Sequence, residues 1–398
     1  MNVLPKSLPL EYELKPLDDV IILEFSKEST IFGRRVSDGH QLVKSVDWGD
    51  TWSNLFRFSS RVESAVVLGD DSILVNVLNG DIFRSIDGGT NFSLVFSPSA
   101  GSATFWCPMD TYDKFVFFAP YANSQKKVFM SNDYGKENSW KEILHVKDPR
   151  VSHPHSVKFD PYENIIWTVW GDHRPSDTIL FSDDFGATWQ QPPGKNYYRC
   201  TNIMPLPNSI WFGTDEKYWI GAYRYERPVE GTSQTKFLPK KYWAARKDSD
   251  DTGPLCWATK PAIIYGREGM AFWGYTQSSL SRLPAQVYAT NGDRVYPIWC
   301  QDKLADGDGG NGIRGVYGPD TEGNLLVSLG SIYNLDGTTT TKALVKIKLD
   351  KVTVDGSTME YYGKSTDTKP IPDKVGATFF EIDTTTVFVW DGTDWVAI

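Results

Sequence analysis

The sequence predicts an all-β protein: a seven-bladed β-propeller in residues 1–350, with six blades as the alternative count, and a small C-terminal β-hairpin extension in residues 351–398. Three observations lead to this prediction: the composition, a motif repeated at blade-sized intervals, and a change of character after Asp350. Aromatic residues make up 14% of the 398 residues, together with 33 Gly and 23 Pro. This composition favours short aromatic strands joined by frequent turns.

One motif recurs four times in the first half of the chain. The copies read SVDWGDTW from Ser45, SIDGGTNF from Ser85, SNDYG from Ser131 and SDDFGATW from Ser182, and the third carries an insertion before Trp140. They start 40, 46 and 51 residues apart, a period that suits one four-stranded blade. Each copy lies between β-type segments and predicts a hairpin turn, in which glycine permits a positive φ, aspartate accepts turn amides, and the closing Trp or Phe packs against the next blade.

This motif resembles the Asp-box, or BNR repeat, of sialidase-like propellers, whose consensus is Ser-x-Asp-x-Gly-x-Thr-Trp. The copies that start at Ser45 and Ser182 match every consensus position. In that family the boxes occupy the turn between the third and outermost strands, away from the ligand face, so the resemblance implies fold more than activity. We therefore expect structural roles for the four motif aspartates, which are Asp47, Asp87, Asp133 and Asp184.

The predicted blade count depends on apolar runs that have the character of inner strands. Seven such runs begin near Val20, Ala65, Trp106, Val157, Ile203, Ile263 and Val316. Blades five to seven lack the repeated motif, and the irregular stretch from Thr201 to Ile298 leaves six blades open. Because an open strand edge invites pairing with other chains, we expect residues Lys6 to Leu14 to close the ring by adding a strand to the last blade.

The C-terminal extension contains two β-type stretches, 376–383 and 387–396, that flank a Thr turn and an Asp-Gly turn. Two strands alone are marginal in water, so we expect the extension to dock on the propeller or to make an oligomer contact. Its pattern resembles terminal hairpins of bacteriophage tail and virion proteins, although an ordinary hairpin is the alternative. With no secretory signal at the start, the resemblance implies a virion protein made in the host cytoplasm, with other virion or tail subunits as partners.

Charge and composition exclude several other classes. A formal net charge of −9 and a pI near 5.2 argue against a nucleic-acid partner, and no apolar run of about 18 residues predicts a membrane span. The four cysteines lie far apart, which indicates core thiols, and five His leave little material for a metal cluster. We expect the rings of His153 and His155 to point apart on extended backbone, and we predict neither a metal nor a cofactor.

The ligand site is expected around the mouth of the propeller channel, where the loops that enter inner strands meet the loops that join second to third strands. Guanidinium groups bind carboxylate and phosphate bidentately, and Trp rings stack on sugars. We therefore predict an anionic host cell-surface glycan as ligand, with scattered solvated cations as the alternative. The candidate ligand-binding residues are Arg61, Trp106, His155, Asp172, Arg174, Arg199, Asp215, Trp219 and Arg314.

An enzymatic role has less support in the sequence. Arg61, Arg199 and Arg314 could mimic the arginine triad of sialidases, but the family's Phe/Tyr-Arg-Ile-Pro motif is missing, and the nearest segment is Phe32-Gly33-Arg34-Arg35-Val36. No tyrosine nucleophile with its Glu base is evident, and nothing predicts a raised pKa in Asp172 or Asp215. We predict binding without catalysis. An exo-sialidase-like glycoside hydrolase and a structural virion protein that docks other subunits are the alternatives, and a homo-oligomer stays open.

Overall fold

The computed structural model divides the chain into two compact units, Met1–Lys348 and Leu349–Ile398. It describes residues 12–17, 19–98, 109–121, 126–171, 177–192, 199–216, 219–227, 240–247, 256–266, 269–277, 285–301, 311–330, 332–333, 339–340, 342–349, 360–363, 365–366, 369, 378–381, 386–390 and 393–397. Over these residues the regular elements are all β-strands. The same residues contain no helix that is long and apolar enough to cross a membrane.

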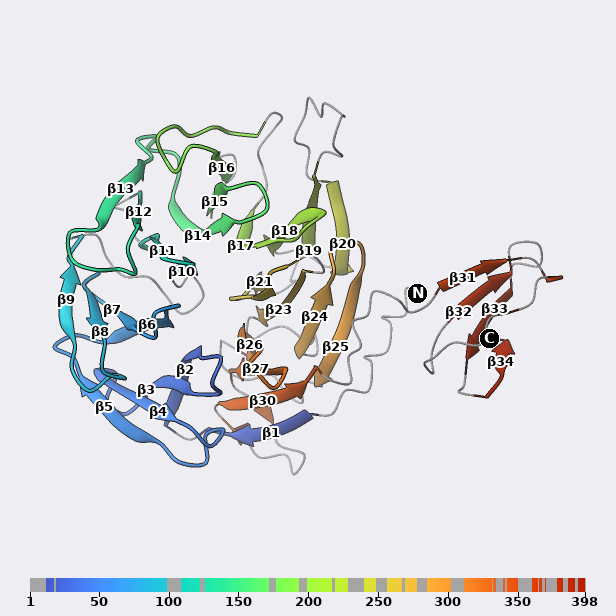
Figure 1. Cartoon of the computed structure of the whole chain (residues 1–398), viewed down its shortest axis with the longest axis horizontal. Helices are drawn as coiled ribbons and strands as arrows, with labels where there is room; N and C mark the ends of the chain where they lie inside the picture. Colours follow the sequence, from blue (N-terminus) through green and yellow to red (C-terminus); the bar gives the residue numbers. More distant parts are fainter. Residues whose placement is uncertain are drawn as a thin grey trace. The chain divides into compact units, whose positions relative to one another are not determined.

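The first unit is a seven-bladed β-propeller whose sheets follow one another in sequence order around a ring (Figure 1). Blade one contains β2 (Val20–Phe25), β3 (Ile31–Arg35), β4 (Gln41–Ser45) and β5 (Ser53–Arg57). Blade two contains β6 (Val62–Val67), β7 (Ile73–Val77), β8 (Ile82–Ser85) and β9 (Ser93–Phe96). Blade three contains β10 (Asp110–Tyr112), β11 (Phe115–Phe118), β12 (Lys127–Ser131) and β13 (Trp140–His145).

The later blades are less regular. Blade four contains β14 (His153–Asp160), β15 (Ile165–Gly171) and β16 (Thr178–Ser182), with a bridge from Phe181 to Gln190 in its outermost position. Blade five contains β17 (Cys200–Pro205), β18 (Ser209–Glu216), β19 (Trp219–Glu226) and β20 (Lys240–Lys247). Blade six contains β22 (Ala262–Ile264), β23 (Met270–Gln277), β24 (Ala285–Thr290) and β25 (Val295–Gln301). The stretch that left the count open therefore forms two blades.

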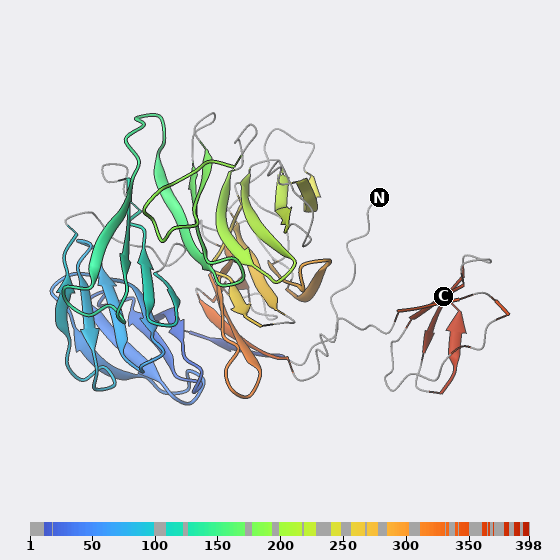
Figure 2. The same ribbon diagram turned by 45° about the horizontal axis from the view of Figure 1, so that its top comes forward.

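Blade seven is completed by the N-terminal end of the chain. It contains β26 (Asn311–Tyr317), β27 (Asn324–Leu329), β30 (Ala343–Lys348) and, outermost, β1 (Tyr12–Pro16), beside the short hairpin of β28 (Ile332–Tyr333) and β29 (Thr339–Thr340). β1 pairs antiparallel with β30, with Tyr12 opposite Ile347 and Pro16 opposite Ala343 (Figure 1 and Figure 2). The closing strand overlaps the predicted segment at residues 12–14. The rest of that segment lies outside the described residues.

The hydrophobic core lies between successive blades rather than within one sheet. Phe117 of blade three and Phe159 of blade four stack with ring centroids 5.9 Å apart, and both side chains are buried. Trp167 of blade four packs edge to face against Phe212 of blade five. Burying one such side chain contributes roughly 1.5–3 kcal/mol to the free energy of unfolding. Because each interface is shared by two neighbouring blades, this burial stabilises both of them. This arrangement explains why the apolar runs are continuous in the inner strands.

The repeated turns join the third strand of a blade to its outermost position. In blade one the Ser45 hydroxyl donates to Asp47 (2.7 Å) and accepts from the Gly49 amide (2.8 Å). The Asp47 carboxylate also accepts from the amide (3.0 Å) and the hydroxyl (2.6 Å) of Thr51. Blade four repeats this network with Ser182, Asp184, Gly186 and Thr188.

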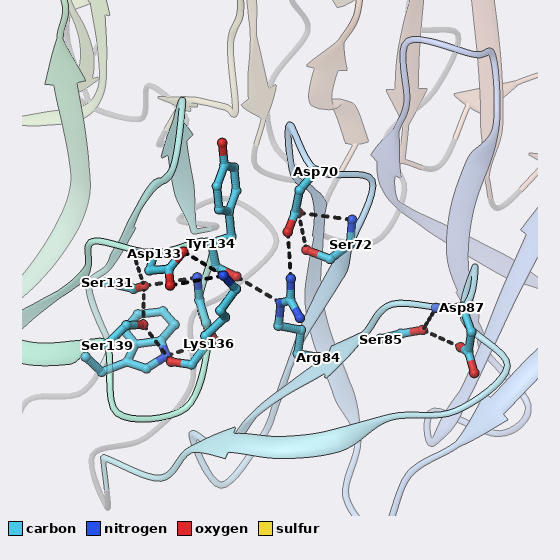
Figure 3. Close-up of polar contacts among 12 residues, drawn as sticks. Asp70, Ser72, Arg84, Ser85, Asp87, Ser131, Asp133, Tyr134, Lys136 and Ser139 are labelled. Carbon is cyan, nitrogen blue, oxygen red and sulfur yellow. Dashed lines mark hydrogen bonds and ion pairs between the residues drawn. The ribbon is translucent and has the colours of Figure 1, made fainter.

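Blades two and three depart progressively from that network (Figure 3). Asp87 accepts from the backbone amide (2.9 Å) and the side-chain amide (2.8 Å) of Asn91, which stands where blade one has Thr51. In blade three the insertion supplies a different partner, since Asp133 accepts from the ammonium of Lys136 at 2.9 and 3.0 Å. The carboxylate therefore holds the inserted residues in that turn.

The motif residues pack against the preceding blade, so the expectation that the closing aromatics contact the next blade is wrong. The Trp189 indole donates to the Ile143 carbonyl of blade three at 2.7 Å. A Cβ on Gly186, which has φ +86°, would lie 2.6 Å from the Cβ of Ile143. Phe92 of blade two likewise packs on Phe58 of blade one, with centroids 5.1 Å apart.

The second unit contains the predicted hairpin, within a sheet of four strands. Its strands are β31 (Glu360–Gly363), β32 (Thr378–Glu381), β33 (Thr386–Trp390) and β34 (Trp395–Ala397). β31 is parallel to β32, and the other neighbours are antiparallel. The predicted second strand, 387–396, is split into β33 and β34. Since two strands alone are marginal, the two further strands give this unit a sheet of its own.

Candidate functional site

The central channel has two distinct ends. We call the end where the inner strands begin the mouth end, and the end where first strands turn into second strands the turn end. Arg84 shows that the repeated turns belong to the turn end, because it donates to Asp70 in the first turn of its own blade (2.7 Å) and to the Tyr134 carbonyl in the repeated turn of blade three (3.0 Å; Figure 3). The predicted ligand residues that the structure describes lie at the mouth end.

A cluster of cations lies at the mouth end where blade seven meets blades one and two. We define this basic cluster as Arg34, Arg61, Arg314 and Lys342. Arg34 is the second-last residue of β3, its side chain is only 11% exposed, and its guanidinium lies 3.4 Å from the Glu63 carboxylate. Arg61 is also paired with Glu63. One buried carboxylate therefore serves two guanidinium groups.

The members of the basic cluster lie close enough for the charge of one to lower the pKa of another. Burial and then the guanidinium of Arg34 lower the pKa of Arg314. Burial and then the charge of Arg314 lower the pKa of Lys342. Like charges disfavour the charged form of each group, and low dielectric strengthens that effect. The cluster therefore concentrates positive charge at the mouth end.

Arg34 and Lys342 were not among the residues predicted from the sequence. Arg34 falls in a segment that drew notice only because it lacks the sialidase motif. The sequence does contain a signal for Arg34, because a charged residue stands near the end of an apolar second strand. The blade topology places the end of a second strand at the mouth end. Lys342 immediately precedes β30, so the same topology could have identified it.

Two histidines of blade four and a tyrosine of blade three lie together at the mouth end. The ring centroids of His153 and His155 are 5.1 Å apart, and that of Tyr121 lies 3.9 Å from His153. The expectation that the two imidazoles point apart is wrong, because residues i and i+2 of a strand share a face. The His155 Nδ1 lies 2.9 Å from the Cys200 carbonyl. Over the described residues, no group of three or more His, Cys, Asp or Glu could hold a metal ion.

Arg199 and Asp215 form a partly buried ion pair on blade five. The Arg199 Nε donates to the Asp215 carboxylate at 2.8 Å, and the Asp215 amide donates to the Arg199 carbonyl at 2.9 Å. Arg199 and Arg61 thus each face a carboxylate of their own chain. Three predicted ligand residues, Trp106, Asp172 and Arg174, lie outside the described residues. Trp219 begins β19, where its backbone pairs with Lys247.

A cavity of about 840 Å³ lies at the turn end of the channel. Its walls come from the first strands and first turns of several blades, including Glu24 of blade one, Asp110 of blade three and Lys260 of blade six. This cavity is at the opposite end from the basic cluster. The sequence analysis nominated no residue there, because it placed the ligand face away from the repeated turns.

Comparison with known proteins supports the fold class. No protein-family model matches the chain, and no characterised protein matches it in sequence. Its structure is similar to YCF48 from Cyanidioschyzon merolae (14% identity, 85% of this chain and 99% of that chain, TM-score 0.52). It is also similar to YCF48 bound to D1 peptide (12%, 86% and 96%, 0.52) and to a catalytically inactive virginiamycin B lyase from Staphylococcus aureus with quinupristin (12%, 85% and 100%, 0.53). The protein is a β-propeller, and at these identities the likeness shows the fold alone.

Proposed function

We propose that the propeller is a non-catalytic binding module that holds an anionic, carboxylate- or phosphate-bearing host cell-surface glycan at its mouth end. The observation that carries this proposal is the basic cluster, in which cations of blades one, two and seven gather at the mouth end while Arg34 and Arg61 share the single carboxylate of Glu63. A guanidinium fork matches the geometry of a carboxylate or phosphate. A bound anion would relieve the repulsion between these cations.

We further propose that the protein works in a bacteriophage particle. The support for this setting is the sequence pattern of the second unit, which resembles terminal hairpins of tail and virion proteins. In this arrangement the second unit contacts other virion subunits and the propeller meets the host glycan. The propeller meets the cell-surface glycan once lysis of the host cell has released the particle.

The test measures binding of a polysialic acid or a teichoic acid to the whole chain by calorimetry. Lys342→Gln is expected to weaken binding about threefold to tenfold, because the free energy of a partly exposed charge pair usually corresponds to a change in affinity of that size. Arg314→Lys should also weaken it, because a point charge cannot replace a planar fork. Affinity should fall as salt rises, since exposed charges are screened within about 8 Å at physiological ionic strength.

Arg57→Gln is the matched control. Arg57 lies on the outermost strand of blade one, is 61% exposed, and is paired with Asp38 at 2.8 Å. Its replacement should leave affinity unchanged. Equal weakening by Arg57→Gln, or binding that does not depend on salt, would contradict the proposal.

Two other outcomes would favour the alternatives. Release of free sugar from the polymer would favour an exo-sialidase-like hydrolase. Tight binding to another virion subunit, with no glycan bound, would favour a docking platform. The similarity in fold to YCF48 bound to D1 peptide makes a peptide partner the natural form of that second alternative.

A further inference from the structure

The cavity at the turn end is lined by two ion pairs that neutralise two partly buried lysines. Lys260 lies 2.9 Å from Glu24, with both side chains about 15% exposed, and Lys158 lies 2.5 Å from Asp110. Lys260 also sits 4.6 Å above the ring of Tyr317. An anionic ligand would have to compete with these carboxylates in a partly buried setting, which is costly. The two lysines therefore make a poor anion site.

The remaining charge of the cavity is negative. Its lining holds five carboxylates and three lysines. Once the two internal pairs are set aside, three exposed carboxylates, Glu28, Asp71 and Asp113, face a single Lys27. No cation in the described part of the chain lies within ion-pair distance of any of these three carboxylates. We call these three residues the rim carboxylates. They attract cations, and they keep their full capacity to accept hydrogen bonds.

The wall below this rim offers aromatic surface and a hydroxyl. Tyr265 and Tyr112 both line the cavity, with ring centroids 5.8 Å apart and nearly perpendicular planes. Burial and then the charge of Asp110 raise the pKa of Tyr265 well above its usual value, so the phenol stays neutral. Among the described residues, none hydrogen-bonds to the Tyr265 hydroxyl. Aromatic faces and neutral oxygen acceptors are the groups that hold organic cations.

We propose that the turn-end cavity is a second binding site, which takes a primary ammonium or guanidinium group carried on a short chain. The cation meets the rim carboxylates Asp71 and Asp113 and contacts the aromatic surface of Tyr112 and Tyr265, whose rings pack edge to face. The volume of about 840 Å³ lies within the usual range for small-ligand sites. Such a group reaches the cavity either as a free polyamine or as a lysine or arginine side chain of a peptide.

The two ends of the propeller then select opposite charges. The basic cluster at the mouth end favours anions, and the turn-end cavity favours cations. The two sites share no residue. The second proposal therefore does not depend on the identity of the glycan.

The test titrates the whole chain by calorimetry with three probes: spermidine, the blocked tripeptide acetyl-Gly-Lys-Gly-amide, and its neutral analogue with norleucine in place of lysine. We expect saturable binding of at least one cationic probe and none of the neutral analogue. Spermidine binding alone indicates a free amine as the natural ligand, and tripeptide binding alone indicates a side chain. Salt should weaken either.

Variants connect the binding to the cavity. Asp71→Asn combined with Asp113→Asn should weaken the cationic probe about threefold to tenfold. Tyr265→Phe removes only the hydroxyl and should weaken binding without lowering the melting temperature. Glu137→Gln is the control, because Glu137 is an exposed carboxylate at the same end that does not line the cavity. Binding of the anionic polymer should be unchanged in all of these variants.

Three results would overturn the proposal: no saturable binding of either cation, equal binding of the neutral analogue, or full affinity in the double variant. Failure of the glycan proposal would appear separately, as absent polymer binding in the unaltered chain. Each proposal can therefore fail without the other.

Discussion

At the scale of single residues, three of the four motif carboxylates are held by several donors each. Asp184 accepts from the hydroxyls of Ser182 and Thr188 and from the Thr188 amide, at 2.6 to 2.8 Å. Hydrogen bonds to the ionised form, chiefly from Thr188, lower the pKa of Asp184 to about 2. Asp47 and Asp87 share this feature, with a pKa of about 2 in each. The folded turn therefore requires the charged carboxylate.

Asp184→Ala should lower the melting temperature while leaving glycan affinity unchanged wherever the protein stays folded. The neighbouring Asp183→Ala is the control, because Asp183 is exposed and no hydrogen bond or ion pair joins its side chain to another described residue. Melting curves of the two variants at pH 7 show whether only Asp184→Ala lowers the melting temperature. Equal destabilisation, or lost binding with an unchanged melting temperature, would contradict the structural role.

The lowered pKa of Asp184 also predicts a pH dependence. Because the folded pKa lies below the unfolded value of about 3.8, the contribution to stability is complete above about pH 4 and is lost as the pH falls towards about 2. The difference in unfolding free energy between the wild type and Asp184→Ala should shrink over that interval. Denaturant titrations at a series of pH values measure it, and a constant difference would contradict the assignment.

At the scale of elements, blades one to four are joined by repeated turns and the later blades by other means. In blade five the Asn202 side chain accepts from the Gly213 amide (2.8 Å) and donates to the Thr259 carbonyl (2.9 Å). β21 (Cys256–Ala258) pairs with both β18 and β23, which joins blades five and six. These links arise from residues with no shared spacing, so the sequence offered no periodic signal for them.

The closing strand β1 is the element whose loss should matter most. Deletion of residues 1–16 removes the partner of β30 and leaves an open edge on blade seven, which should lower the melting temperature and promote aggregation. Deletion of residues 1–11 is the control, since it leaves β1 in place. Light scattering and thermal melts compare the two. Identical behaviour of both truncations would mean that β1 does not hold the ring closed.

At the scale of the whole molecule, the two compact units should be separable. Because β30, the last propeller strand in the chain, ends at Lys348, a chain of residues 1–348 should fold with the melting temperature of the full propeller. Class averages of particles viewed down the axis should have seven spokes. Aggregation of the truncated chain would instead indicate that the extension docks on the propeller, as the sequence analysis allowed.

The sequence by itself determined the features that depend on local chemistry and regular spacing. Repeats at blade-sized intervals predicted the propeller, and six of the seven predicted inner-strand starts lie within the first strands of their blades, while Trp106 lies outside the described residues. The glycines and aspartates of the turns were identifiable because their roles depend on neighbours within eight residues. The predicted mouth-end residues Arg61 and Arg314 lie beside cations that no local pattern revealed.

Only the tertiary structure decided what depends on distant residues meeting. It brought Arg34 beside Arg314, 280 positions away in the chain, and it paired Arg199 with Asp215. It reversed the direction in which the turn aromatics pack, and it opened a cavity at the end that the sequence analysis had set aside. Radial closure is the physical reason, since a ring of blades places residues from every repeat around one axis, whatever their separation in sequence.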